Sequence, residues 1–179
     1  MGGWPELAQL MGQMPNISGF NICSVVAGLG QQPTMSSSTW PAANRAVFIP
    51  FRLAVPITVT QFWLLNGETV PGTEHFDIGV YDLAGTKIAS TGSTDQTGVS
   101  VLQTVDVTDF TIGPGGFYLA CAMDTNTATI LDIWPTLECC RLVGLAEQAS
   151  AFPLPATATL AVITFNSIQA FGLSTRTTV

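Results

Sequence analysis

The residue most able to do chemistry in this chain is its one histidine, His75, which stands between Glu74 and Asp77 in the sequence GTEHFD. A hydrolase with a serine or cysteine nucleophile needs that nucleophile, a histidine and a carboxylate within hydrogen-bonding reach of one another. A single histidine at the start of a strand is more typical of a surface or turn residue. We therefore predict no catalytic residue and expect that the protein is not an enzyme.

Two pairs of acidic residues could in principle act as acid and base on a glycoside: Glu74 with Asp77, and Asp106 with Asp109. Acids at the ends of strands more commonly cap turns and interact with water, and we favour that interpretation. The sequence has no P-loop, no dinucleotide-binding glycine fingerprint and no zinc-ligand spacing. We expect no cofactor.

Metal binding has two possible sources in the sequence. Oxygen ligands for calcium occur close together at Asp124, Asn126 and Asp132, but their spacing matches no calcium-binding loop. The four cysteines are Cys23, Cys121, Cys139 and Cys140. Two of the cysteines are adjacent, which suits neither an ordinary disulfide nor a zinc site. We predict no metal site, and expect the cysteines to be small buried side chains in a reducing compartment.

Aromatic side chains could instead stack on sugar rings. The candidates are Trp40, Trp63, Trp134, Tyr81 and Tyr118. Alternation along ITVTQFWLLNG, which begins at Ile57, places Trp63 with Ile57 and Val59 on the buried face. We therefore favour packing over sugar binding.

The composition indicates contact with other proteins. Charged residues are 9% of the 179 residues, against about 25% in typical soluble domains. A surface with so little charge is better suited to a protein partner than to water alone. Five basic residues and a net charge of −7 argue against nucleic-acid binding. We also predict no membrane association, because no apolar run approaches the roughly 18 residues that a spanning helix needs.

From Ala46 onward the hydrophobic pattern alternates with period two, which is typical of strands. Pro50 cannot donate to a strand ladder, so its strand is predicted at an edge or a bulge. HFDIGVYD is predicted to expose Asp77 and Tyr81, and DLAGTKIAS to form a hairpin. GPGGFYLACAMD is apolar on both faces and is predicted to be central.

Seven or eight short strands at roughly ten-residue spacing predict an all-β, antiparallel β-sandwich or jelly-roll-like fold. The segment 137–149 has room for one or two turns of helix. We assign residues 44–179 to the sandwich domain, and residues 1–43, rich in Gly, Pro and Ser after a short predicted helix, to an extended N-terminal arm and linker. The arm residues expected to contact a partner are Trp4, Leu7, Leu10, Met11, Met14, Phe20 and Trp40.

Two arginines flank Pro50, at Arg45 and Arg52, in a chain with few cations. We expect them to pair with carboxylates on adjacent strands, with Asp77 or Asp82 as partners. A contact between subunits is the alternative. The residues predicted to anchor the structure are Arg45, Pro50, Arg52, Asp77, Tyr81 and Asp82.

The region from about residue 40 to 124 resembles a known family. Its recurring elements are an NRA-x-x-x-PFR strand, a (D/N)-x-GVYD-x-x-G-x-(K/R) hairpin, a GST-x-Q-x-G turn and a G-x-YYLA-(L/M)-x-x-D strand. The chain keeps Asn44, Arg45, Pro50, Phe51, Arg52, Gly79, Tyr81, Asp82, Gly92, Ser93, Thr94, Gln96, Gly98, Tyr118, Leu119, Ala120 and Asp124, and has Phe117 in place of the first Tyr of the last element. These motifs resemble the small β-sandwich structural proteins of tailed bacteriophages and prophages.

The resemblance implies a structural component of the virion. We expect a capsid decoration or cement subunit that binds the major capsid protein or other virion proteins through its N-terminal arm. The alternative is a tail or fibre component with a glycan-binding sandwich. A homo-oligomer, possibly a trimer, fits either role. The N-terminal sequence MGGWPELAQL lacks the features of a secretory signal, so we expect assembly in the bacterial host cytoplasm.

Overall fold

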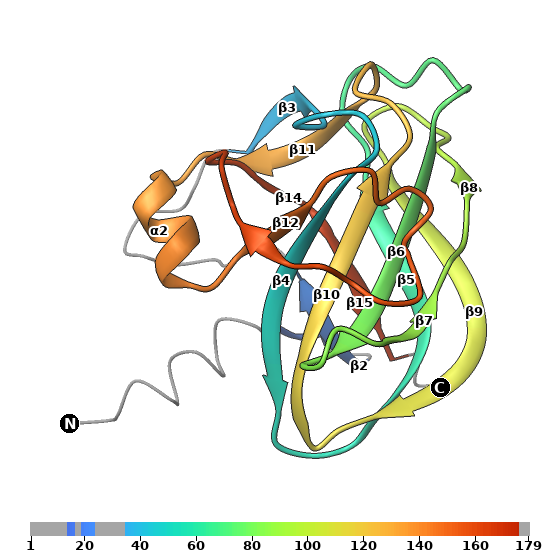
Figure 1. Cartoon of the computed structure of the whole chain (residues 1–179). Helices are drawn as coiled ribbons and strands as arrows, with labels where there is room; N and C mark the ends of the chain where they lie inside the picture. The colour runs from blue at the N-terminus through green and yellow to red at the C-terminus, as the bar shows by residue number, and fades with distance from the viewer. Residues whose placement is uncertain (1–13, 17–18, 24–34, 176–179) are drawn as a thin grey trace.

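A computed structural model of the chain describes residues 14–16, 19–23 and 35–175. These residues form antiparallel sheets and one short helix, α2 (Leu137–Leu142), which confirms the predicted all-β class. In Figure 1 the two largest sheets form the body, and α2 lies at one side of it. None of the helical structure in the described residues is long and apolar enough to cross a membrane.

The strands of the described residues fall into three sheets. The five-stranded sheet has the order β1 (Met14–Asn16), β2 (Gly19–Cys23), β15 (Phe171–Ser174), β5 (Ile57–Leu65) and β9 (Leu102–Ile112). The seven-stranded sheet has the order β13 (Ala161–Val162), β12 (Ala146–Gln148), β4 (Arg45–Leu53), β10 (Gly115–Met123), β6 (His75–Asp82) and β7 (Lys87–Ser90), and β8 (Thr94–Asp95) also pairs with β6. The three-stranded sheet has the order β14 (Ile168–Gln169), β11 (Thr129–Ile133) and β3 (Ser36–Thr39).

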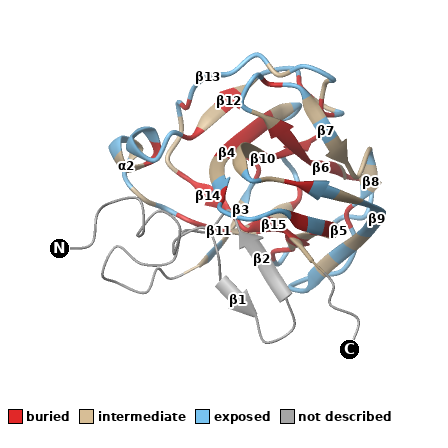
Figure 2. Cartoon of the chain, turned by 90° about the horizontal axis from the view of Figure 1, so that it is seen from below, coloured by how far each residue is buried: buried red, intermediate tan, exposed pale blue. Residues whose placement is uncertain are grey.

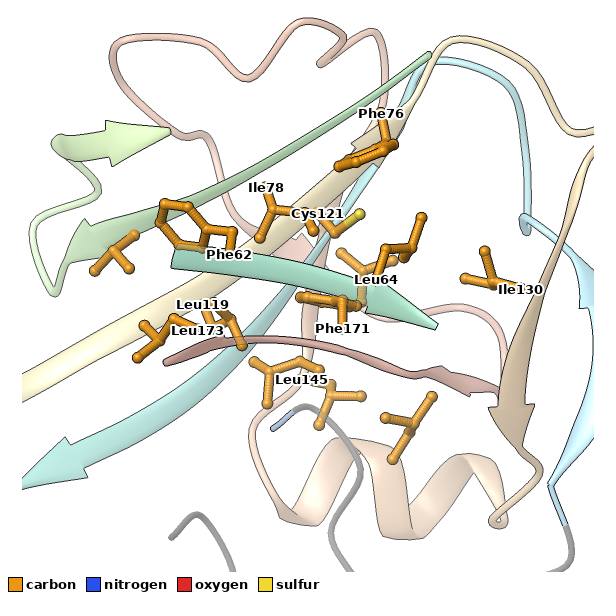
Figure 3. Packing of buried hydrophobic residues seen from close by; sticks show 14 of the residues in the cluster. Phe62, Leu64, Phe76, Ile78, Leu119, Cys121, Ile130, Leu145, Phe171 and Leu173 are labelled. Atoms are coloured by element: carbon orange, nitrogen blue, oxygen red, sulfur yellow. The ribbon is translucent and has the colours of Figure 1, made fainter. Parts of the chain in front are cut away.

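The main core lies between the two larger sheets, where Figure 2 shows most of the buried residues. In the close view of Figure 3, Phe62 of β5 and Phe171 of β15 face Ile78 of β6 and Leu119 of β10. All four side chains are almost fully removed from water. Burial of large apolar side chains such as these is the dominant favourable term in folding.

A second hydrophobic cluster covers the other face of the seven-stranded sheet. Phe48, Tyr81 and Ala120 pack there with Ala151 and Leu154, which come from the segment 151–158. The inner strands of this sheet are therefore buried on both faces, and β10 lies between β4 and β6, which confirms its predicted central position.

The predicted exposure of Asp77 and Tyr81 is wrong. Both residues are fully buried, because the segment 151–158 folds back over the face of β6 that alternation assigns to solvent. The predicted hairpin is confirmed, since β6 and β7 pair antiparallel across a turn in which the amide of Gly85 donates to the carbonyl of Asp82.

A register shift between Val59 and Gln61 in the pairing of β5 with β9 changes which face each later residue occupies. Val59 is buried before the shift, and Phe62 and Leu64 are buried after it. Trp63 is consequently only half-buried, and its predicted place in the buried set is wrong. An irregularity of this kind inserts residues into one strand and so breaks simple alternation.

Pro50 lies at a local edge although β4 is an inner strand. The short strand β12 pairs with β4 at Ala46, Val47 and Phe48, while on the other side Pro50 faces Tyr118 of β10. Pro50 is therefore beyond the residues that pair with β12. A residue without an amide hydrogen is tolerated best where a strand has no neighbour on one side. The prediction that this strand lies at a sheet edge or a bulge is wrong, because β4 lies between β12 and β10 and pairs with β10 without a register shift.

Candidate interaction surfaces

The described part of the N-terminal segment forms the first two strands at one edge of the five-stranded sheet. Met14 lies in β1 and Phe20 in β2; β1 pairs antiparallel with β2, and β2 pairs with β15 through partners such as Ile22 and Leu173. Main-chain pairing at a sheet end is a general way for an extended segment to bind a folded protein. The other predicted contact residues Trp4, Leu7, Leu10 and Met11 lie outside the described residues.

Trp40 belongs to the core of its own chain, which corrects its predicted role in contact with a partner. Its side chain is 1% exposed, and its indole Nε1 donates to the carbonyl of Arg45 over 2.7 Å. The preceding strand β3 pairs with β11. Residues 36–40 are therefore integrated in the sandwich, although the sequence places the start of that domain at residue 44.

The opposite end of the same sheet is β9, which pairs with β5 on one side and has no further strand beside it among the described residues. Figure 2 shows its exposed residues at the rim of the molecule. Leu102 at its start and the preceding Val99 and Val101 are exposed apolar side chains. Exposed acids, Asp106 and Asp109, also lie in this strand. Charges on an open edge disfavour pairing with an identical strand, so this edge is better suited to a different partner than to a second copy.

Further exposed apolar side chains lie around α2. Leu142 at the end of the helix is 85% exposed, and Val143 follows it. Val162 of β13 and Trp134 after β11 are also exposed. Single exposed apolar residues are ordinary on a protein surface.

Arg45 pairs with a carboxylate other than the two that the sequence predicts. Its Nη1 lies 3.0 Å from Oε2 of Glu147 in β12. The other oxygen of Glu147 accepts a hydrogen bond from Thr164 Oγ1 over 2.9 Å, and the Arg45 guanidinium lies 5.9 Å from the ring centre of Phe165. Arg52 is exposed. The prediction that Arg45 pairs with Asp77 or Asp82 is wrong, because β12 rather than β6 brings a carboxylate to the start of β4.

The predicted anchors on β6 hold the segment 151–158 and a turn. The carboxylate of Asp77 accepts the amide N–H of Leu154 over 3.0 Å and the Thr91 hydroxyl over 3.2 Å, and burial raises the pKa of Asp77. The Tyr81 hydroxyl donates to the carbonyl of Pro155 over 2.6 Å. Asp82 accepts the amide N–H of Thr86 over 2.8 Å and so closes the hairpin turn.

The sequence shows a single histidine without an evident partner, but in the structure His75 lies between two carboxylates. Its Nδ1 is 2.7 Å from Oδ2 of Asp124, and its Nε2 is 3.2 Å from Oδ1 of Asp95. Asp124 is 49 residues away in the chain, so no local motif reveals the cluster. No group of three or more histidine, cysteine or acidic side chains within the described residues has an arrangement that could hold a metal ion.

Three of the five aromatic residues that could stack on sugars are packed within the described part of the chain. Trp40 and Tyr81 are buried, and Tyr118 packs edge-on against Phe48. Of the described cysteines, Cys121 and Cys140 are buried free thiols whose burial raises their pKa, whereas Cys139 is partly exposed.

Comparisons of the chain with protein-family models, with curated proteins and with solved structures found no match. The motifs of the sequence and the surfaces described above are therefore the features that indicate a function.

Proposed function

We propose that the chain is a non-enzymatic structural subunit of a tailed-phage virion, and that it decorates the capsid by binding neighbouring virion proteins through its N-terminal residues. The observation that carries the proposal is the position of β1 and β2. These strands extend the five-stranded sheet at its end. An N-terminal segment that joins the body by strand pairing can lead the residues before it toward a neighbour.

The surface gives a second line of support. The chain carries a charge on only 9% of its residues, and Val99, Val101 and Leu102 form a run of exposed apolar side chains close to the open edge of β9. A partner that covers this edge would bury these side chains and pair with free main-chain groups. The resemblance of the motifs to those of tailed-phage structural proteins supports the virion of a tailed phage as the assembly that contains this chain.

The proposal is tested with two deletions that leave every described residue in place. Removal of residues 1–13 takes away Trp4, Leu7, Leu10 and Met11, and removal of residues 176–179 is the matched control. Each protein is mixed with undecorated capsids of the same phage, and the bound fraction is measured by co-sedimentation. We expect both deletions to keep the wild-type thermal unfolding midpoint and only the first to lose binding. Binding of the first deletion at wild-type occupancy would show that the N-terminal residues are not the attachment device.

A further inference from the structure

His75 connects three parts of the chain at one end of the seven-stranded sheet. It is the first residue of β6, and its register partner Asp95 lies in the two-residue strand β8. Asp124 follows the last residue of β10 and also accepts the main-chain N–H of His75 over 2.9 Å. The side chains of His75, Asp124 and Asp95 are 39%, 22% and 75% exposed, so protons can reach the imidazole freely.

The geometry distinguishes the two protonation states of the imidazole. Both ring nitrogens lie within 3.2 Å of a carboxylate oxygen, and an ionised carboxylate can only accept hydrogen bonds. Neutral imidazole has one N–H and can donate to one of these partners, which leaves a lone pair facing the other carboxylate. The imidazolium can donate from Nδ1 to Asp124, and its positive charge also attracts Asp95, which lies at ion-pair distance from Nε2. The observed contacts therefore fit the charged form of His75.

The groups that face His75 are all acidic. Asp124 follows the end of β10, Asp95 lies in β8, and Glu74 directly precedes His75 in the chain. The hydrogen bond with Asp124 is the largest cause that raises the pKa of His75 above 6.5, and the charges of the three carboxylates act in the same direction. Partial removal from water opposes them.

We propose that His75 is a pH-dependent latch. Protonated His75 holds β8 against the end of β6 through its contact with Asp95, and neutral His75 loses one of its two carboxylate contacts. The segment that β8 begins continues into Gln96, which is held by hydrogen bonds to Asn66 Oδ1 over 2.9 Å and to the carbonyl of Glu74 over 2.8 Å. The exposed Val99 and Val101 follow. The hydrogen bonds of Gln96 do not involve His75, so the latch acts on the pairing of β8 with β6 and not on the residues that follow.

The sign of the pH dependence follows from the direction of the shift. A histidine whose pKa is raised in the folded state stabilises that state fully below its unfolded value near 6.5. The contribution disappears as the pH rises through the folded value. The latch is therefore closed in mildly acidic solution and opens on the alkaline side.

NMR titration tests the latch directly, because His75 is the sole histidine of the chain and its ring signals need no assignment by mutation. We expect a midpoint above 6.5 in the wild type. Asp124→Asn should shift the midpoint down, Asp95→Asn should shift it down by less, and Asp109→Asn, which removes an exposed acid of β9, should leave it unchanged. In the same samples, amide protection factors of residues 94 and 95 should fall as the pH passes the midpoint, and His75→Gln should abolish this change.

Three results would overturn the proposal: a wild-type midpoint at or below 6.5, midpoints unaltered by both Asp124→Asn and Asp95→Asn, or a pH profile of amide protection that is the same in wild type and His75→Gln. Asp95→Asn changes a side chain that is 75% exposed. The Asp95→Asn variant should therefore fold, and its midpoint still tests the proposal if Asp124→Asn does not fold.

Discussion

Replacing Arg45 with alanine should destabilise the sandwich strongly, because it leaves a nearly buried carboxylate without its cation. Breaking a buried Arg–carboxylate pair costs about 3–5 kcal/mol. The Arg45 side chain is 27% exposed and that of Glu147 10%, and Thr164 remains as a partner of Glu147. Solvent screening therefore reduces the loss, and we expect the free energy of unfolding to fall by about 2–3 kcal/mol.

Urea unfolding followed by tryptophan fluorescence measures this loss. With a urea m value of about 2 kcal/mol/M, the midpoint should fall by about 1–1.5 M. Arg52→Ala is the matched control, because Arg52 lies exposed on the same strand and its removal should change stability by less than about 0.5 kcal/mol. The double variant with Glu147→Ala should lose less than the sum of the two single variants, since the pair is broken only once. Equal midpoints for Arg45→Ala and Arg52→Ala would refute the reasoning.

Two further predictions concern the face covered by the segment 151–158. Tyr81→Phe removes the hydroxyl that donates to the Pro155 carbonyl, so it should cost about 1 kcal/mol and lower the thermal midpoint by about 2–4 °C; an unchanged midpoint would mean that water replaces the bond. Gly79→Ala places a Cβ 2.7 Å from the Ala89 carbonyl oxygen and 3.1 Å from Leu154 Cδ1, which should cost about 1–3 kcal/mol in the same urea assay. Wild-type stability of Gly79→Ala would show that β7 and the covering segment move aside freely.

The strands of the sandwich could be predicted because their signal is local. The segments around Val47, Ile78 and Leu119 are apolar at the spacing of a strand, and the turn at Gly85 ends one strand and starts the next. Pro50 predicted an edge strand, and this was wrong because the short strand β12 pairs with the first part of β4 and leaves Pro50 outside that pairing.

The faces of the strands and the polar partners could not be predicted in the same way. The register shift after Val59 depends on β9, and it moves Trp63 away from the core. Asp77 and Tyr81 are buried by a segment whose residue Leu154 is 77 positions from Asp77. Glu147 is 102 residues from Arg45, so only the fold identifies it as the partner.

The His75 cluster illustrates the same limit at a candidate site. The sequence shows Glu74 and Asp77 beside the histidine, yet neither is the hydrogen-bonding partner of its ring. Asp95 and Asp124 reach the ring because β8 and β10 pair with β6 on its two sides. Partners supplied by strand pairing have no sequence spacing by which they could be recognised.

A cryo-EM map of the intact particle tests the proposed virion role most directly. We expect density for the sandwich on the capsid exterior, with residues 1–13 lying against neighbouring virion proteins. A particle map without this chain, or one in which residues 1–13 contact only their own sandwich, would contradict the account.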